Sequence, residues 1–440
     1  MEAGTEECAA ARGDPPIRSL SLAYASAHFG KSIFWYGSES LFAFLLTEVA
    51  QLRPVSVGWV LCLSFLFSAA LDLAVGVLLK RRLSTALAAA HLQLVGAFAT
   101  SVALIFLFSV PAIKPESPLA ISAAAVVLFR MAYAFIDIPQ NAMLSSAVGN
   151  IGDRAFLASA RLAGSGLAAL TVAATVALLV YSEASSRAPL LVAVGFIMAF
   201  LTICACLMLY VAVRQRSSTR VESSTISNAI SPAASGRALH AAAWVLIAAM
   251  FTTSFASPVF TKLLPYYAAV HLLDPVRGTV AISMVSVGMV LGQPIWLRVL
   301  KHRSGPAKIV VTCLATSVTA TLFWLAGAGA VWAIVPAAFL FGITSGGVGT
   351  ALWSAYADVI AHGAAGKEGL AYGVFTASAK LSLAISAAGI GLLLSDPTFR
   401  EPANNHLLTG MTLPAVLVGL VTALFVGALR QRSRVDRSLA

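Results

Sequence analysis

Charged residues are scarce in this chain. Only 11% of its 440 residues are Asp, Glu, Lys or Arg, against about 25% in a typical soluble protein. Hydrophobic residues make up 59%, and mean hydropathy is +0.87. So few charges cannot cover a water-soluble surface, which excludes a soluble globular domain. Because a helix of about 20 apolar residues crosses a bilayer, the composition predicts an all-α integral membrane protein whose main partner is the lipid bilayer.

Cysteine is equally sparse. Four of the five cysteines fall inside apolar runs, and their spacing fits neither a disulfide framework nor a metal site. Cys204 and Cys206 would point to nearly opposite sides of a helix, so they cannot chelate together. The signatures His-Glu-x-x-His and Gly-x-Ser-x-Gly are also missing. We therefore expect no metal, no cofactor, no catalytic residues and no enzymatic activity, which disfavours a membrane-bound acyltransferase.

Positive charge is plentiful by comparison, with 29 basic against 18 acidic residues and a net charge of +11. Most of these basic residues lie in short loops, where they report topology and not a nucleic-acid partner. If the N-terminus is cytoplasmic, eighteen of them lie on that side and five on the other. The positive-inside rule then places both termini in the cytoplasm, with the protein in the inner (plasma) membrane of the cell.

Apolar runs separated by charged or Pro/Gly breaks predict twelve transmembrane helices in two six-helix halves, the arrangement of the major facilitator fold. Residues 214–237 hold seven serines and four arginines and cannot bury enough apolar area to fold alone, so they predict a flexible cytoplasmic linker. The expected spans are 20–50, 56–79, 83–110, 118–146, 158–181, 188–213, 241–272, 278–300, 308–329, 331–362, 366–394 and 407–429. The expected divisions are an N-terminal tail 1–19, a half 20–213, a linker 214–240, a half 241–429 and a basic tail 430–440.

Several charges lie inside these spans. On insertion scales each costs about 2.5 to 3.5 kcal/mol at the bilayer centre, so such residues usually face a bundle interior or an aqueous pathway. The alternative for any one of them is a structural ion pair that locks helices together. Arg130 and Asp137 are seven residues apart, with Tyr133 between them, and can share one helix face. The charges are Lys31, Glu39, Asp72, Arg130, Asp137, Lys262, Asp358 and Lys380.

Ser68 and Trp353 are further candidate site residues, although neither is charged. Asp72 has Ser68 one turn before it, and this pair of oxygen donors is typical of a cation or proton site. Trp353, in the tenth span, can stack on a sugar ring or serve as a core tryptophan. His28 is interpreted as a packing histidine.

Five segments in order along the chain resemble the glycoside-pentoside-hexuronide:cation symporters, a branch of the major facilitator superfamily. They are HFGKSIFWYG with LLTEV in the first span, SFLFSAALDLAVG in the second, YAFIDIPQNAM in the fourth, Arg161 in the fifth and AYGVFTASAK in the eleventh. The likeness covers nearly the whole chain.

This resemblance implies a role for each matching residue. Asp137 and Arg161 would hold solute hydroxyls, with Tyr133 and Lys31 beside them. Asp72 would be the cation-site carboxylate. Lys380, one turn after Thr376, would lie between the cation and solute sites and respond to both.

The chain departs from the family pattern where carboxylates are expected. Ser68 stands one turn before Asp72, and Ser32 follows the lysine of the first span. Both losses weaken the case for sodium-driven galactoside transport. Arg130, Glu39 and Lys262 add charges that could serve an acidic solute.

The sequence therefore predicts a secondary active transporter, a monomer, that moves a small polar solute such as a sugar or glycoside by alternating access. Coupling to a proton or another cation is expected. One alternative is a proton-driven exporter of drug-like, amphipathic or lipid-like solutes, indicated by the many small residues. An alternative of another class is a transport-inactive receptor or scaffold, although such a protein has no reason to keep Asp72, Asp137, Arg161 and Lys380.

Overall fold

The computed structural model is helical throughout most of the part it describes. The described residues are 17–44, 54–79, 82–113, 118–148, 150–181, 183–223, 236–272, 275–363, 367–401 and 405–439. No strand occurs among them. The predicted all-α class is thereby confirmed.

The long helices match the expected spans one by one. Among the described residues, ten helices are long and apolar enough to cross a membrane, and α9 with α10, bent by 41° at the break between them, forms an eleventh candidate. Helix α2 is the remaining long one and is more polar because it carries Lys31, Ser32 and Glu39. The helices are α2 (Ile17–Phe44), α3 (Pro54–Leu78), α4 (Ala86–Ile113), α5 (Pro118–Ser146), α6 (Ile151–Tyr181), α7 (Ala184–Ser223), α8 (Gly236–Tyr267), α9 (Pro275–Leu291), α10 (Gln293–Leu300), α11 (Gly305–Gly329), α12 (Ile334–Gly363), α13 (Glu368–Leu393) and α14 (His406–Leu439).

Helix ends extend further than the apolar runs. Helix α7 continues to Ser223 and α8 begins at Gly236, so both ends of the expected flexible linker 214–240 are helical. Helix α14 likewise continues to Leu439 through the basic tail. An existing helix adds one hydrogen bond for each residue it gains, so it can continue past the apolar segment. Residues 224–235 lie outside the described part, and the expected domain boundaries stay a prediction.

The chain divides into two compact units. Unit 1 comprises residues 1–40, 70–242 and 357–374, and unit 2 comprises 41–69, 243–356 and 375–440. Each unit is described by itself below.

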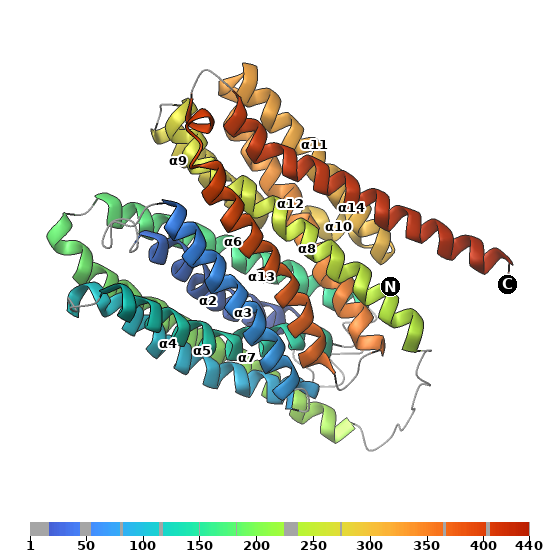
Figure 1. Ribbon diagram of the computed structural model, residues 1–440. Coiled ribbons are helices and arrows are strands. Elements are labelled where there is room, and N and C mark those ends of the chain that lie inside the picture. Colours follow the sequence, from blue (N-terminus) through green and yellow to red (C-terminus); the bar gives the residue numbers. More distant parts are fainter. Residues whose placement is uncertain are drawn as a thin grey trace. The chain divides into compact units, whose positions relative to one another are not determined.

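In unit 1, helix α4 packs against α5 and α7 (Figure 1). The contact with α5 is tight because Gly96 lies against the backbone of Phe135, where an added Cβ would come closer than 3.0 Å. Pro139 lies four residues after Phe135 and has no N–H to donate to its carbonyl. Gly96 therefore lets α4 approach α5 within one turn of Asp137.

We expect Gly96→Val to destabilise the protein, because the new side chain overlaps the α5 backbone. Overpacking of this kind costs about 1 to 3 kcal/mol. Thermal unfolding of purified protein, followed by size-exclusion chromatography, measures the effect. Gly389→Ala is the control, since nothing lies within 4 Å of its added Cβ. Equal melting temperatures for the two variants would contradict the close approach.

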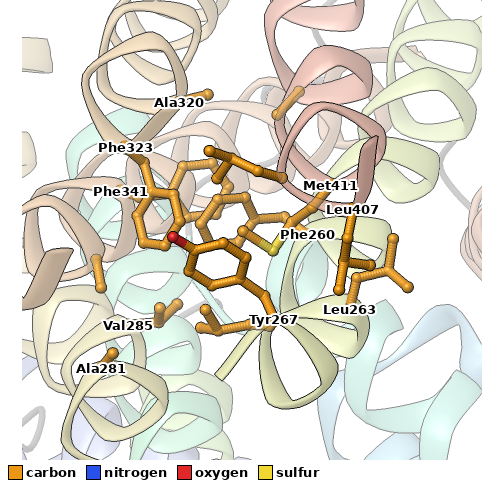
Figure 2. Packing of buried hydrophobic residues seen from close by; sticks show 14 of the residues in the cluster. Phe260, Leu263, Tyr267, Ala281, Val285, Ala320, Phe323, Phe341, Leu407 and Met411 are labelled. Carbon is orange, nitrogen blue, oxygen red and sulfur yellow. The ribbon is translucent and has the colours of Figure 1, made fainter. Parts of the chain in front are cut away.

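Unit 2 contains an apolar core with residues from α8, α9, α11, α12, α13 and α14, part of which is drawn in Figure 2. Phe260 of α8 stacks on Phe341 of α12 with ring centroids 3.8 Å apart and meets Phe323 of α11 edge-on at 4.9 Å. Val285 of α9 and Met411 of α14 belong to the same cluster. The aromatic contacts thus join α8, α11 and α12, and the cluster extends to α9 and α14.

Candidate functional site

The centre of the candidate site is an ion pair between Lys31 on α2 and Asp137 on α5. Lys31 Nζ lies 2.7 Å from Asp137 Oδ1, and both residues are buried. Because these helices are far apart in sequence, the pair ties the first span to the fourth. This geometry fits a solute-binding residue pair, and it also fits the structural ion pair considered above.

Asn141 joins this pair to a third charged group. Its Oδ1 accepts hydrogen bonds from Lys31 Nζ at 3.0 Å and from Arg161 Nη1, and its Nδ2 donates to Asp137 Oδ1 at 2.9 Å. Asn141 lies one turn after Asp137 in α5, so both point to the same side of the helix. Lys31, Asp137, Asn141 and Arg161 form a continuous network, hereafter the polar network, from α2, α5 and α6.

Hydrogen bonds between α2 and α5, and a close contact between α6 and α2, surround this network. Tyr24 Oη donates to the backbone oxygen of Gln140 at 3.0 Å, and His28 Nδ1 lies 3.3 Å from the Gln140 side-chain oxygen. Gly164, one turn after Arg161, lies against the backbone oxygen of Ala25, where a Cβ would come within 2.5 Å. Helix α6 can therefore approach α2 closely enough for Arg161 to reach Asn141.

Aromatic rings lie next to the polar network. The guanidinium carbon of Arg130 is 4.8 Å from the centroid of the Trp35 ring, a cation–π contact. The ring centroids of Trp35 and Tyr133 are 5.5 Å apart, and Tyr133 Oη is 3.5 Å from the backbone oxygen of Lys31. Trp35 and Tyr133 thus bring apolar ring surface beside Lys31, and the partly buried Trp35 keeps some of its surface accessible.

Acidic and basic groups balance in this region. Arg130 interacts electrostatically with Glu39 and Asp72, while the polar network holds two cations and one carboxylate. Together they count three basic residues (Lys31, Arg130, Arg161) and three acidic residues (Glu39, Asp72, Asp137). An uncharged solute would leave this balance unchanged, whereas a charged one would upset it unless a coupled ion compensates.

The candidate coupling residues are buried as well. Asp72 is fully buried on α3, and Gly373 of α13 lies against its backbone oxygen. Ser68 precedes it by one turn, and its buried Oγ has no hydrogen-bond partner among the described residues. Thr376 and Lys380 are buried on α13. Since Asp72 belongs to unit 1 and the other three to unit 2, their joint role stays a prediction.

Trp353, also in unit 2, packs edge-on against Phe375 with centroids 4.9 Å apart. It is 6% exposed, which is the environment of a core tryptophan. Its role in solute stacking stays a prediction. The described residues contain no group of three or more His, Cys, Asp or Glu side chains that could hold a metal ion.

One further pair lies outside the polar network. Arg154, in the first turn of α6, forms an ion pair of 3.1 Å with Asp358 near the end of α12. The sequence analysis counts Asp358 among the charges inside the spans and does not identify Arg154 as its partner. The structure shows that the two charges compensate each other at the helix ends of unit 1.

The sequence reading singled out Lys31, Arg130, Tyr133, Asp137 and Arg161, and unit 1 brings all five into one region. It missed the connecting role of Asn141, although the i, i+4 spacing of Asp137 and Asn141 was visible in the motif YAFIDIPQNAM. It also missed Trp35, for which the signal was its place between Lys31 and Glu39.

Comparison with known proteins identifies the fold and a family. Residues 23–437 match the family described as MFS/sugar transport protein. No curated protein matches the chain.

Solved structures with the same fold carry different cargoes by their descriptions. A bacterial homologue of the iron transporter ferroportin, in its outward-facing state, superposes with a TM-score of 0.69 at 13% identity, covering 94% of this chain and 100% of that one. The proton:xylose symporter XylE, bound to 6-bromo-6-deoxy-D-glucose, gives 0.63 at 13% identity, covering 94% and 95%. The human organic anion transporter MFSD10 gives 0.57 at 14%, covering 94% and 100%. At these identities the likeness shows the major facilitator fold alone.

Proposed function

Because the chain belongs to the MFS/sugar transport protein family, we propose that it is a secondary active transporter of a small, uncharged, hydroxyl-rich solute such as a sugar or glycoside. The family makes the chain an integral membrane transporter and not an enzyme. The solute class, the coupling ion and the cytoplasmic placement of both termini belong to the proposal.

The observation that carries the solute class is the polar network. A carboxylate accepts hydrogen bonds from two neighbouring hydroxyls, and a guanidinium or ammonium donates to hydroxyl oxygens. Asp137, Lys31, Asn141 and Arg161 therefore offer both acceptors and donors within one small region. Trp35 and Tyr133 add ring surface suited to the C–H face of a sugar.

The charge balance favours an uncharged solute over an acidic one. Lys31 pairs with Asp137, Arg130 has Glu39 and Asp72 in its surroundings, and the three basic groups of the region are matched in number by three acidic ones, so no net positive charge is left over for a solute carboxylate. This argues against the acidic solute that Arg130 and Glu39 indicated from sequence. Export of amphipathic or drug-like molecules is the second possibility, and it makes no use of the hydrogen-bonding capacity of the polar network.

Transport follows from alternating access. If the solute and the coupling cation both bind more tightly to the same set of conformations, the gradient of one drives the other. The family resemblance assigns the cation to Asp72 and the communication between sites to Lys380, one turn after Thr376. Ser68 departs from the family pattern and offers a hydroxyl oxygen beside Asp72. A receptor or scaffold that keeps the fold would need none of these buried charges.

We expect a neutral sugar or glycoside to raise the melting temperature of the purified full chain. A ligand present at 100 times its dissociation constant stabilises the folded state by about 2.7 kcal/mol. The screen compares neutral pentoses, hexoses and glycosides with uronides, amphipathic cations and organic anions. Solute counterflow in proteoliposomes then tests whether the best ligand is carried.

The screen also separates the alternatives. If only amphipathic compounds stabilise the protein, the sugar transporter is contradicted and export of amphipathic or drug-like molecules is supported. Stabilisation by uronides alone would show that the charge balance does not decide the solute. A sugar that binds but gives no counterflow would favour the receptor.

A further inference from the structure

A pocket at one end of unit 1 is separate from the polar network. It has a volume of about 410 Å³ and opens where the helix ends meet. Helix α2 contributes Leu20 near its start, the connection from α3 to α4 contributes Ser84 and Thr85, and α7 contributes Val213 and Arg216 near its end. These helices begin or end on the same side of the unit, so the pocket lies at the level where the spans leave the bilayer.

The pocket is lined by one type of charge together with hydroxyl groups. Arg216 is partly buried and supplies positive charge, while Ser84 and Thr85 supply hydroxyls that can donate hydrogen bonds. Among the residues that the structure describes, no acidic side chain lines the pocket. A guanidinium with hydroxyl groups is suited to bind the oxygens of a phosphate group.

The surroundings add positive charge to the entrance. Arg18 and Arg82 are exposed and lie within a few residues of the lining positions on α2 and before α4. Positively charged pockets at the helix ends of membrane proteins attract anionic lipid headgroups, and each basic residue strengthens that attraction.

Apolar residues occur in the pocket wall and further along two of the helices that line it. Leu20 and Val213 line it, and α4 and α7, which pack against each other, expose apolar side chains further into the span. These include Val95 and Phe98 on α4 and Met208 on α7. A ligand here therefore meets a phosphate-binding end and an apolar track, which is the chemistry of a phospholipid and not of a soluble phosphate ester.

We propose that this pocket binds the headgroup phosphate of an anionic phospholipid, with the acyl chains lying along the exposed faces of α4 and α7. The site is independent of the transported solute, since it shares no residue with the polar network. It would anchor α2, α4 and α7 to one leaflet of the bilayer.

The test uses native mass spectrometry of the full chain with phosphatidylglycerol and phosphatidylcholine of identical acyl chains. The unmodified protein should retain phosphatidylglycerol at about tenfold lower lipid concentration than phosphatidylcholine, because both lipids carry the phosphate but the quaternary ammonium of phosphatidylcholine is repelled by the basic pocket. Arg216→Gln should abolish this preference. Arg214→Gln is the matched control: it removes the same charge two residues away, on nearly the opposite side of α7, and should keep the preference.

A second variant protects the test against misfolding. Ser146→Leu keeps every arginine but fills part of the pocket wall, and it should lower phosphatidylglycerol retention about tenfold with an unchanged melting temperature in lipid-free detergent. Equal loss in Arg216→Gln and Arg214→Gln would overturn the proposal in favour of general surface charge. Full competition by soluble glycerol phosphate at the same concentration would overturn the lipid as the source of the phosphate.

Discussion

Asp137→Asn is expected to abolish solute binding and to lower the free energy of unfolding by about 3 to 5 kcal/mol, the usual cost of removing one partner from a buried ion pair. The substitution leaves Lys31 and Arg161 without the carboxylate of the polar network. It also removes the acceptor that would bind two solute hydroxyls. The measurements are thermal unfolding with and without the sugar identified by the screen, and counterflow in proteoliposomes.

A double substitution separates binding from structure at this position. Lys31→Met with Asp137→Leu removes both charges of the pair, and replacing a buried ion pair with apolar residues is often neutral or stabilising. We expect this variant to regain much of the stability lost in Asp137→Asn but to remain unable to bind solute. If the pair were purely structural, the double variant would recover transport together with stability.

Thr202→Val provides the control for lost hydrogen bonding alone. Thr202 Oγ1 donates to the backbone oxygen of Gly30 at 3.0 Å, outside the polar network and between α7 and α2. Its loss should cost about 1 kcal/mol and leave solute affinity within a factor of two or so. An affinity loss equal to that of Asp137→Asn would mean that any disturbance of α2 impairs the site.

The fold could be predicted from composition because each span stands out as a long apolar run. Helix boundaries were less predictable, as Ser223 and Leu439 show, since a helix that leaves the membrane keeps its own hydrogen bonds without an apolar sequence. The ten or eleven apolar helices found among the described residues come close to the twelve spans expected, whereas the helix ends differ more.

The site was partly predictable for a related reason. Charged residues such as Lys31, Asp137 and Arg130 are costly inside a span, so their presence in the sequence is enough to make them candidate site residues. Asn141 carries no such cost, and only the rotation of α5 against α2 and α6 shows that it connects three charged groups. Arg154 illustrates the opposite case, because a charge at a helix end is solvated by default and its pairing with Asp358 depends on tertiary packing.

The expected driving ion follows from the sequence position of Ser68. Sodium is held by several oxygens, and two carboxylates one turn apart compensate its charge far better than one carboxylate with a hydroxyl. A proton needs a single basic oxygen. Asp72 is fully buried, and the buried Ser68 hydroxyl lacks a hydrogen-bond partner among the described residues. A proton or an ion bound at this position would interact with a carboxylate and a hydroxyl inside an apolar span.

We therefore predict that uptake follows the pH gradient and is insensitive to sodium. Asp72→Asn should abolish accumulation against a gradient, an effect of tenfold or more in the steady-state ratio, yet retain downhill exchange, because the solute site in the polar network is intact.

Lys380→Ala should also uncouple transport if Lys380 neutralises Asp72 in the empty carrier, as the family resemblance implies. Uptake of labelled solute into proteoliposomes under separate proton and sodium gradients measures each case.

The same substitution placed at two positions on α3 gives the sharpest form of this prediction. Ser68→Asp creates a carboxylate one turn before Asp72 and should introduce sodium stimulation, whereas Ser64→Asp, two turns before Asp72, should not. Ser64 is buried on the same helix, so both variants carry a comparable insertion cost, and their difference reports the geometry of the ion site. Strong sodium stimulation of the unmodified protein without pH dependence would instead show that hydroxyl or backbone oxygens complete a sodium site around Asp72.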